Sequence, residues 1–181
     1  MKPWKVLDEK EISPSRWFPL FVNRVELPNG KEIDYYFSRL DNVAMVVAIT
    51  PKKEVVLVRQ YKHGVREITL ELPAGTVGSH TPEQAAKKEL QEETGIVADR
   101  LIPIGDLLSS PSKISTRVYG FIATDAIISQ KQDLDDTEEI EVVLHPVTGI
   151  DNLIKAGRLK QSDSIALLAM ARLEYPALFR D

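Results

Sequence analysis

Short apolar and alternating stretches dominate the first two thirds of the chain, and they predict strands. Residues 17–27 alternate loosely, Asn29-Gly30 is typical of a tight hairpin turn, and residues 33–40 would form the returning strand. Residues 43–49 (VAMVVAI) are continuously apolar, which is typical of a strand buried on both faces. Further strands are predicted at residues 55–61, 68–72, 101–108, 118–124 and 140–144.

The best-marked helix lies between residues 82 and 94. Thr81 can cap it, Pro82 suits its first position, and Gln84 completes a capping box. Gly95 can end the helix in the left-handed conformation. This segment therefore has a defined start and a defined end.

Two helices are predicted near the C-terminus. A short one spans residues 150–156, and a longer one runs from a cap at Ser162 to about Glu174. The longer helix carries an apolar stripe of Ile165, Leu168, Ala169 and Leu173. Because strands outnumber helices and the order is mixed, we expect an α/β layered domain.

Composition narrows the function classes. The chain has 181 residues, a length typical of one domain, and a net charge of −4, which offers no basic surface for nucleic acid or an anionic membrane. It has no cysteine, which excludes disulfides, cysteine zinc sites and thiol nucleophiles. No apolar run is long enough to span a membrane, and Met1–Lys5 leads into no signal-peptide core. We expect a cytoplasmic protein that binds neither nucleic acid nor membrane.

Three glutamates on the well-marked helix are the main chemical signal. Glu89, Glu92 and Glu93 stand at positions i, i+3 and i+4 and so share one face. At about 100° per residue this face lies beside the apolar positions rather than the lysines. A solvated acidic face is the alternative, but carboxylates beside a packing face cost desolvation unless a cation compensates. Oxygen ligands without histidine or cysteine suit Mg²⁺ or Mn²⁺, which commonly hold substrate phosphates.

At this point the sequence resembles the Nudix hydrolases. Gly75 opens their signature and residues 88–96 (KELQEETGI) close it. Residues 70–75 (LELPAG), residues 58–62 (VRQYK) and the Ser110-Pro111-Ser112 loop look like the ADP-ribose pyrophosphatase branch. The resemblance extends from about Val43 to Ala171.

Two positions depart from the family signature. His80 stands where the family has its first glutamate, and the loop after Gly75 is one residue short. Lys88 replaces an arginine whose planar fork would orient the adjacent glutamate, and a lysine offers a point charge instead. Both departures leave the three helix glutamates in place.

The resemblance implies a fold and a domain organisation. The expected fold is a Nudix-like α/β/α sandwich with a mixed β-sheet at residues 43–181. An N-terminal antiparallel β-hairpin region at residues 1–42 resembles the extra strands with which this branch builds dimers. Its many aromatic residues also favour a homodimer.

The resemblance also implies the roles of individual residues. Glu89, Glu92 and Glu93, joined by the Ala74 carbonyl, would bind Mg²⁺ or Mn²⁺ and act in catalysis. In the acidic stretch 133–142, Glu138 falls on the family's further catalytic carboxylate, with Asp136 two residues before it; a solvated acidic turn is the alternative.

The substrate end of the site is implied in the same way. Lys62 stands where the branch often has a phosphate-contacting arginine, Glu71 where it has a carboxylate near the metal, and Pro111 in its substrate loop. Tyr61 could stack on a nucleobase, although a strand tyrosine is more often a core or dimer contact, and Lys62 could equally be a surface lysine.

The leading hypothesis is therefore a Mg²⁺-dependent pyrophosphohydrolase that cleaves a nucleoside diphosphate sugar, with ADP-ribose giving AMP and ribose 5-phosphate as the first candidate. One alternative keeps this chemistry on another nucleotide sugar or a dinucleotide. Another, suggested by His80 and Lys88, is a catalytically weak domain that binds nucleotides as a sensor. An oligomerising structural protein is the third.

Overall fold

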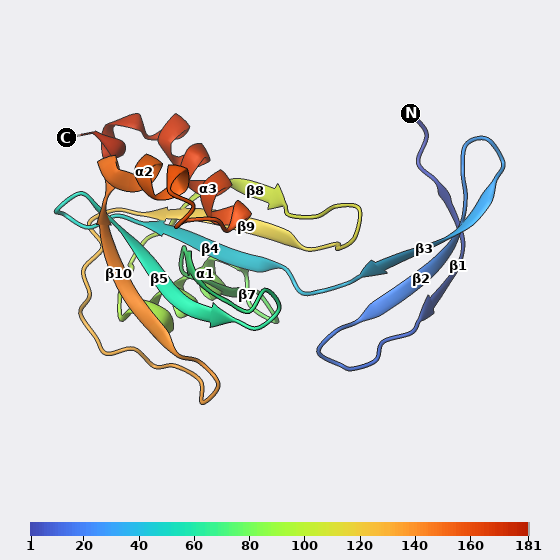
Figure 1. The fold of residues 1–181 in the computed structure, drawn as a ribbon, viewed down its shortest axis with the longest axis horizontal. Coiled ribbons are helices and arrows are strands. Elements are labelled where there is room, and N and C mark those ends of the chain that lie inside the picture. Colours follow the sequence, from blue (N-terminus) through green and yellow to red (C-terminus); the bar gives the residue numbers. More distant parts are fainter. Residues whose placement is uncertain (181) are drawn as a thin grey trace. The chain divides into compact units, whose positions relative to one another are not determined.

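The computed structural model describes residues 1–180 and divides the chain into two compact units. The first unit contains residues 1–41 together with residues 108–117. The second contains residues 42–107 and the chain from Val118 onward. Figure 1 shows the strands and helices of both units.

The first unit is a three-stranded antiparallel sheet in the order β1 (Lys5–Glu11), β2 (Leu20–Glu26) and β3 (Glu32–Ser38). The hairpin between β2 and β3 is confirmed, and Gly30 adopts a positive φ of 81° in its turn. Strand β1 was not predicted, because it is mostly charged and every one of its residues is exposed. Such a sequence has no buried face to leave a pattern.

Residues 108–117 pair with this sheet through backbone groups. The Ser38 N–H donates to the Lys113 carbonyl, and the Ser115 N–H donates to the Ser38 carbonyl. The Tyr35 hydroxyl donates to the Ser112 carbonyl. The first unit is thus assembled from two segments that lie far apart in the sequence.

The second unit contains two sheets. One has the order β10 (Ile140–Pro146), β5 (Glu54–Lys62) and β6 (Glu67–Glu71), all antiparallel. The other has the order β7 (Ala74–Thr76), β4 (Val43–Ala48), β9 (Arg117–Ala123) and β8 (Ile102–Leu108), with β4 and β9 parallel. The unpredicted β7 is three residues long, and the Pro-Ala-Gly sequence at its start is typical of a turn.

Helices cover both faces of these strands. Alternate residues of β4 enter two apolar clusters: Met45 and Val47 pack with α2 (Ile150–Lys155) and α3 (Ser162–Glu174), whereas Val46 packs with α1 (Pro82–Thr94). Figure 1 shows α2 and α3 together on one side of the strands. Short 3₁₀ helices η1 (Val147–Gly149) and η2 (Pro176–Phe179) flank α2 and α3. The predicted α/β class with a mixed sheet is confirmed.

Two details of the prediction for α3 were wrong. The N-cap is Gln161 rather than Ser162, because the longer Gln161 side chain folds back to accept the Ser164 N–H at 2.5 Å. The buried face is Ser164, Leu167, Leu168 and Ala171, and Leu173 is 84% exposed. Of the predicted stripe, Leu168 is buried and Ile165 packs against the core, whereas Ala169 and Leu173 are exposed.

No helix among residues 1–180 is both long enough and apolar enough to cross a membrane.

Candidate active site

Helix α1 carries the three predicted glutamates, and its ends are fixed as expected. The Gln84 N–H donates to Thr81 Oγ1 at 3.2 Å, and the Thr81 N–H donates to Gln84 Oε1 at 2.9 Å. Gly95 ends the helix with a φ of 71°. Ala85 and Leu90 bury the packing face. The capping and the packing together set the rotation of the helix, and so the direction of its glutamates.

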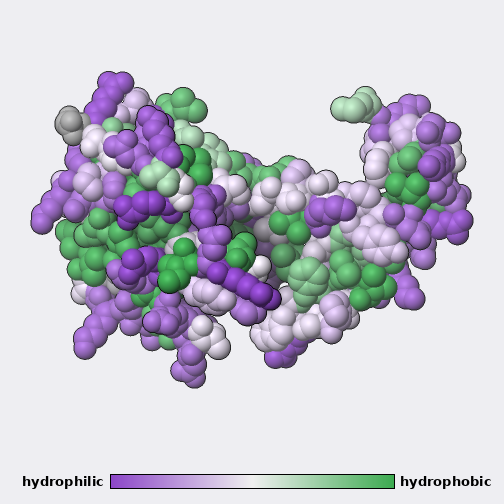
Figure 2. Space-filling view, in the orientation of Figure 1, coloured by the Kyte–Doolittle hydropathy of each residue, from purple (hydrophilic) through white to green (hydrophobic). Residues whose placement is uncertain are grey.

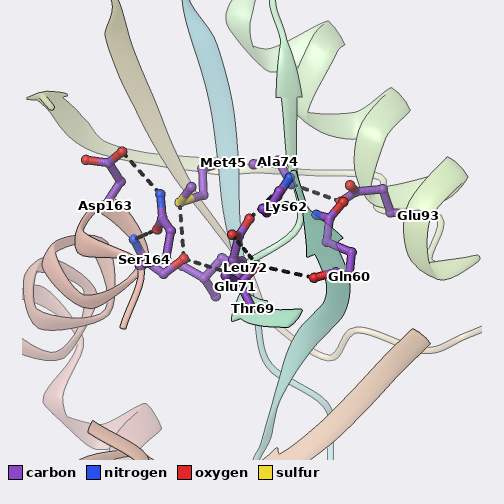
Figure 3. Close-up of polar contacts among 11 residues, drawn as sticks. Met45, Gln60, Lys62, Thr69, Glu71, Leu72, Ala74, Glu93, Asp163 and Ser164 are labelled. Atoms are coloured by element: carbon purple, nitrogen blue, oxygen red, sulfur yellow. Dashed lines mark hydrogen bonds and ion pairs between the residues drawn. The ribbon is translucent and has the colours of Figure 1, made fainter. Parts of the chain in front are cut away.

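Glu93 is the most buried of the three, with 4% of its surface exposed. Its Oε2 accepts the backbone N–H of Ala74 at 3.0 Å. Burial raises the pKa of Glu93 to about 8, against the opposing effect of the Ala74 hydrogen bond, and the charge of Glu89 raises it further. Figure 3 shows Glu93 reaching from α1 to Ala74 at the start of β7.

Glu89 lies one turn earlier and against β7. A Cβ built on Gly75 would stand 2.0 Å from Glu89 Cδ, so only a residue without a side chain leaves room for this carboxylate. Burial raises the pKa of Glu89; the charge of Lys88 lowers it, and those of Glu92 and Glu138 raise it. Two carboxylates that burial and mutual repulsion drive towards protonation thus converge on the Ala74-Gly75 backbone.

The environment of Glu92 differs from that of Glu89 and Glu93. Its carboxylate forms an ion pair with Lys88, one turn earlier on the exposed side of α1. That hydrogen bond raises the pKa of Lys88. The lysine that replaces the family's arginine is therefore engaged with Glu92.

The acidic stretch is hydrogen-bonded to the C-terminal end of α1. The Asp133 N–H donates to the Glu92 carbonyl, and Gln132 Nε2 donates to the carbonyls of Glu93 and Ile140 at 2.6 and 3.1 Å. The Asp135 N–H donates to Glu138 Oε2 at 3.2 Å. The charge of Glu138 raises the pKa of both Glu89 and Glu93, which places it in their electrostatic range. Nothing in the sequence marked Gln132 as the anchor of this stretch.

A second polar group lies on the adjoining β5–β6 hairpin. Lys62 Nζ is 3.5 Å from Glu71 Oε2, and the Thr69 hydroxyl donates to Glu71 Oε1 at 2.7 Å. The charge of Lys62 lowers the pKa of Glu93, so the lysine faces the same space as the α1 carboxylates. Figure 3 shows Lys62, Glu71 and Thr69 beside Ala74 and Glu93. Sequence reasoning had found Lys62 and Glu71 but not Thr69.

Of the other two substrate candidates, Tyr61 does not point towards these carboxylates, and Pro111 belongs to the first unit. Tyr61 is next to Lys62 on β5, so the pleat turns it to the opposite face. It is 54% exposed, and its hydroxyl lies 3.2 Å from His63 Nδ1. Pro111 is exposed in the 108–117 segment of the first unit. His80, at the altered signature position, is also exposed.

The donor set around Ala74 fits a hard divalent cation in its chemistry. Glu89, Glu93 and the neighbouring main chain offer oxygens alone, and a cation would offset the burial and the like charges that raise both pKa values. Across residues 1–180, however, no three acidic or histidine side chains stand as a preformed metal cluster. Because Glu92 is paired with Lys88, its carboxylate would have to exchange that partner for the ion.

Two family models match the sequence of this chain. Residues 38–168 match the family model described as NUDIX domain, and residues 4–38 match the one described as Nucleoside diphosphate sugar hydrolase N-terminal domain.

Relatives with assigned names have similar lengths. An ADP-ribose pyrophosphatase of Bacillus subtilis is 32% identical over 146 residues, covering 77% of this chain and 79% of that protein. A GDP-mannose pyrophosphatase of Yersinia enterocolitica is 28% identical, covering 90% of this chain and 92% of that protein. A methanol dehydrogenase activator of Bacillus methanolicus is 26% identical, covering 94% and 93%.

The fold has a counterpart among solved structures. A crystal structure titled as an ADP compounds hydrolase superposes with a TM-score of 0.86 at 23% identity, over 98% of this chain and 96% of the other. This likeness supports the predicted sandwich fold. Because the family model covers well over half of the chain, the protein belongs to the Nudix hydrolases.

Proposed function

We propose that this protein is a Mg²⁺-dependent pyrophosphohydrolase of nucleoside diphosphate sugars, and that ADP-ribose, cleaved to AMP and ribose 5-phosphate, is its substrate. One observation carries the proposal: the carboxylates of the buried Glu93 and the half-buried Glu89 converge on the backbone of Ala74 and Gly75. Two of the three relatives above are named as pyrophosphatases of this substrate class. The N-terminal family model supports the same class.

Glu89, Glu92 and Glu93, with the Ala74 carbonyl, would hold Mg²⁺ or Mn²⁺. When bound, the ion supplies charge neutralisation at the diphosphate and activation of water. The chain's own contribution is to keep these oxygens fixed: the Ala74 N–H orients Glu93, and the open space at Gly75 admits Glu89.

Other residues would act on the substrate directly. Lys62, held by Glu71, presents an ammonium group to the phosphates from the β5–β6 hairpin. Glu138, exposed and within electrostatic range of Glu89 and Glu93, would accept the proton of the attacking water. Its carboxylate is tethered by the Asp135 N–H, which limits where it can accept that proton.

Two alternatives have specific support. The GDP-mannose pyrophosphatases match this chain over nearly its full length, which favours another nucleotide sugar with the same chemistry. The pairing of Lys88 with Glu92, at a position where the family has arginine, favours a nucleotide sensor with weak catalysis.

The test is product analysis with a matched variant. Purified protein with Mg²⁺ is incubated with nucleoside diphosphate sugars, dinucleotides and nucleoside triphosphates, and the products are separated by chromatography. AMP from ADP-ribose, abolished by chelator and by Glu93→Gln but retained in Glu83→Gln, is the expected result. Glu83 is exposed on the same helix and pairs with Lys87, so its substitution controls for loss of charge.

Each other outcome has a meaning. Cleavage of a different substrate would keep the mechanism and replace ADP-ribose. No cleavage of any compound, with thermal stabilisation by nucleotides, would favour the sensor.

We also propose that the protein is a homodimer. The first unit exposes large apolar side chains, with Trp17 77%, Val6 56% and Tyr36 51% exposed. Figure 2 shows apolar surface on this unit among hydrophilic residues. Exposed apolar side chains of this size and number are typical of a protein–protein interface. Sedimentation of a monomer at micromolar concentration would contradict the dimer.

A further inference from the structure

The chain changes sheets immediately before the carboxylate site. The last pair of β6 is Glu71 with Val58 of β5, and the first pair of β7 is Ala74 with Met45 of β4. Between them, Leu72 and Pro73 belong to no strand. A backbone N–H at such a crossing needs a partner from elsewhere, because a buried one without a partner is costly.

Ser164 of α3 supplies that partner. Its Oγ accepts the Leu72 N–H at 2.9 Å and lies 3.9 Å from the Met45 sulfur. Ser164 is completely buried, and Leu72 is 1% exposed. Figure 3 shows Ser164 contacting both Leu72 and Met45. One hydroxyl thus touches the chain two residues before Ala74 and also the residue that pairs with Ala74.

Helix α3 itself does not need this hydroxyl. The Ser164 N–H is already capped by Gln161, and the neighbouring buried positions of the helix are Leu167, Leu168 and Ala171. A buried serine among such residues is destabilising unless its hydroxyl is hydrogen-bonded. Its hydrogen-bond partners are Leu72, in the link between β6 and β7, and Met45 on β4.

We propose that Ser164 is a positioning residue that holds the main chain of Ala74 in place against Glu93, an inference that rests on the function proposed above. The segment is fixed at successive residues: Leu72 by Ser164, the Pro73 carbonyl by the Val46 N–H at 3.0 Å, and the Ala74 N–H by Glu93. Loss of the first contact frees the segment to shift, and the Ala74 carbonyl and the Glu93 carboxylate then lose their mutual alignment. Small displacements of this kind reduce the rate of the reaction more than they reduce the binding of substrate.

The experiment compares Ser164→Ala with Ala171→Gly in the full-length protein. Ala171 is equally buried two turns along α3, and its substitution destabilises the helix without removing a hydrogen bond to Leu72 or Met45. Ser164→Cys preserves side-chain volume but offers a weak acceptor, so it separates loss of the hydrogen bond from loss of packing. Amide hydrogen exchange by NMR reports on Leu72 and Ala74 directly, and kinetics report on activity as Mg²⁺ is varied.

Ser164→Ala and Ser164→Cys are expected to speed exchange at Leu72 and Ala74 by about tenfold or more beyond Ala171→Gly at equal global stability. Both should lower kcat about tenfold with KM little changed, and should raise the Mg²⁺ concentration for half-maximal rate. Exchange and kinetics indistinguishable from those of Ala171→Gly would overturn the positioning role. If the wild-type protein cleaves no diphosphate, the proposed function fails, whereas unchanged exchange at Leu72 and Ala74 would separately refute the role of Ser164.

Discussion

The carboxylate of Glu89 occupies the space that a side chain at Gly75 would fill. A Cβ at Gly75 would lie 2.0 Å from Glu89 Cδ and 2.3 Å from both of its oxygens, and no positive φ requires glycine there. The glycine is therefore needed for the position of Glu89 rather than for the backbone.

Gly75→Ala should displace Glu89 and lower kcat by about a hundredfold while leaving the protein folded. The clash meets the end of a flexible side chain, so the cost falls on the site rather than on the core. Gly64→Ala is the matched control, because nothing lies within 4 Å of its Cβ and its φ is also ordinary. Equal activity of the two variants would show that Glu89 need not lie against β7. Hydrolysis rates and thermal unfolding of both variants, measured in parallel, test this prediction.

Metal-free protein should lose stability as the pH rises from about 4.5 to about 8. The pKa of Glu93 is raised from 4.5 to about 8, so in this window the folded form holds a proton that the unfolded form has released. The free energy of unfolding then falls with pH, by up to about 1.4 kcal/mol per unit. Glu93→Gln should flatten this slope and leave the part that is due to Glu89, because the amide does not titrate. Urea unfolding in EDTA across the window measures it; parallel curves for wild type and variant would contradict the assignment.

Mg²⁺ should stabilise the protein more at alkaline than at acidic pH. Protons on Glu93 and Glu89, whose pKa values are both raised, compete with the ion for the same oxygens. The rise in Tm on adding Mg²⁺ should therefore be larger at about pH 9 than at about pH 6, and small in Glu93→Gln at either pH. A Tm shift independent of pH, or equal in the variant, would place the ion elsewhere.

Lys62→Met should raise KM for the diphosphate substrate about tenfold, since it removes an ammonium group from the space shared with Glu93. Lys160→Met is the control: it also breaks a lysine–glutamate pair, with Glu67 of β6, and both side chains there are exposed. Steady-state kinetics that change equally in the two variants would argue against a phosphate contact at Lys62.

Much of this architecture was predictable because its signals are local. The capping box of Thr81 and Gln84, the stop at Gly95 and the apolar run of β4 are each recorded in consecutive residues. The structure confirms all three. The side of α1 that buries Glu93 also followed from helical periodicity alone.

What could not be predicted depends on contacts between distant residues. The hydrogen bond between Leu72 and Ser164 joins residues that are 92 positions apart in the sequence. The hydrogen bond between Gln132 and Glu93 joins residues that are 39 positions apart. The sequence around Gln132 is typical of a polar loop, and a serine such as Ser164 is common in the first turn of a helix. Neither pattern predicts a distant partner. The sequence places Tyr61 on a strand. The face of the strand that its side chain occupies could not be predicted, because it depends on how β5 packs in the sheet.

The pairing of residues 108–117 with the N-terminal sheet bears on how the chain can be divided. Ser38, Tyr35 and Leu40 supply partners to Lys113, Ser112 and Thr116. Cutting the chain before residue 42 would leave the β8–β9 connection with unmatched backbone groups, and joining residues 1–41 to another protein would transfer an incomplete sheet unit. The first unit is therefore not a detachable module, and any exchange of it between relatives has to move two stretches of sequence together.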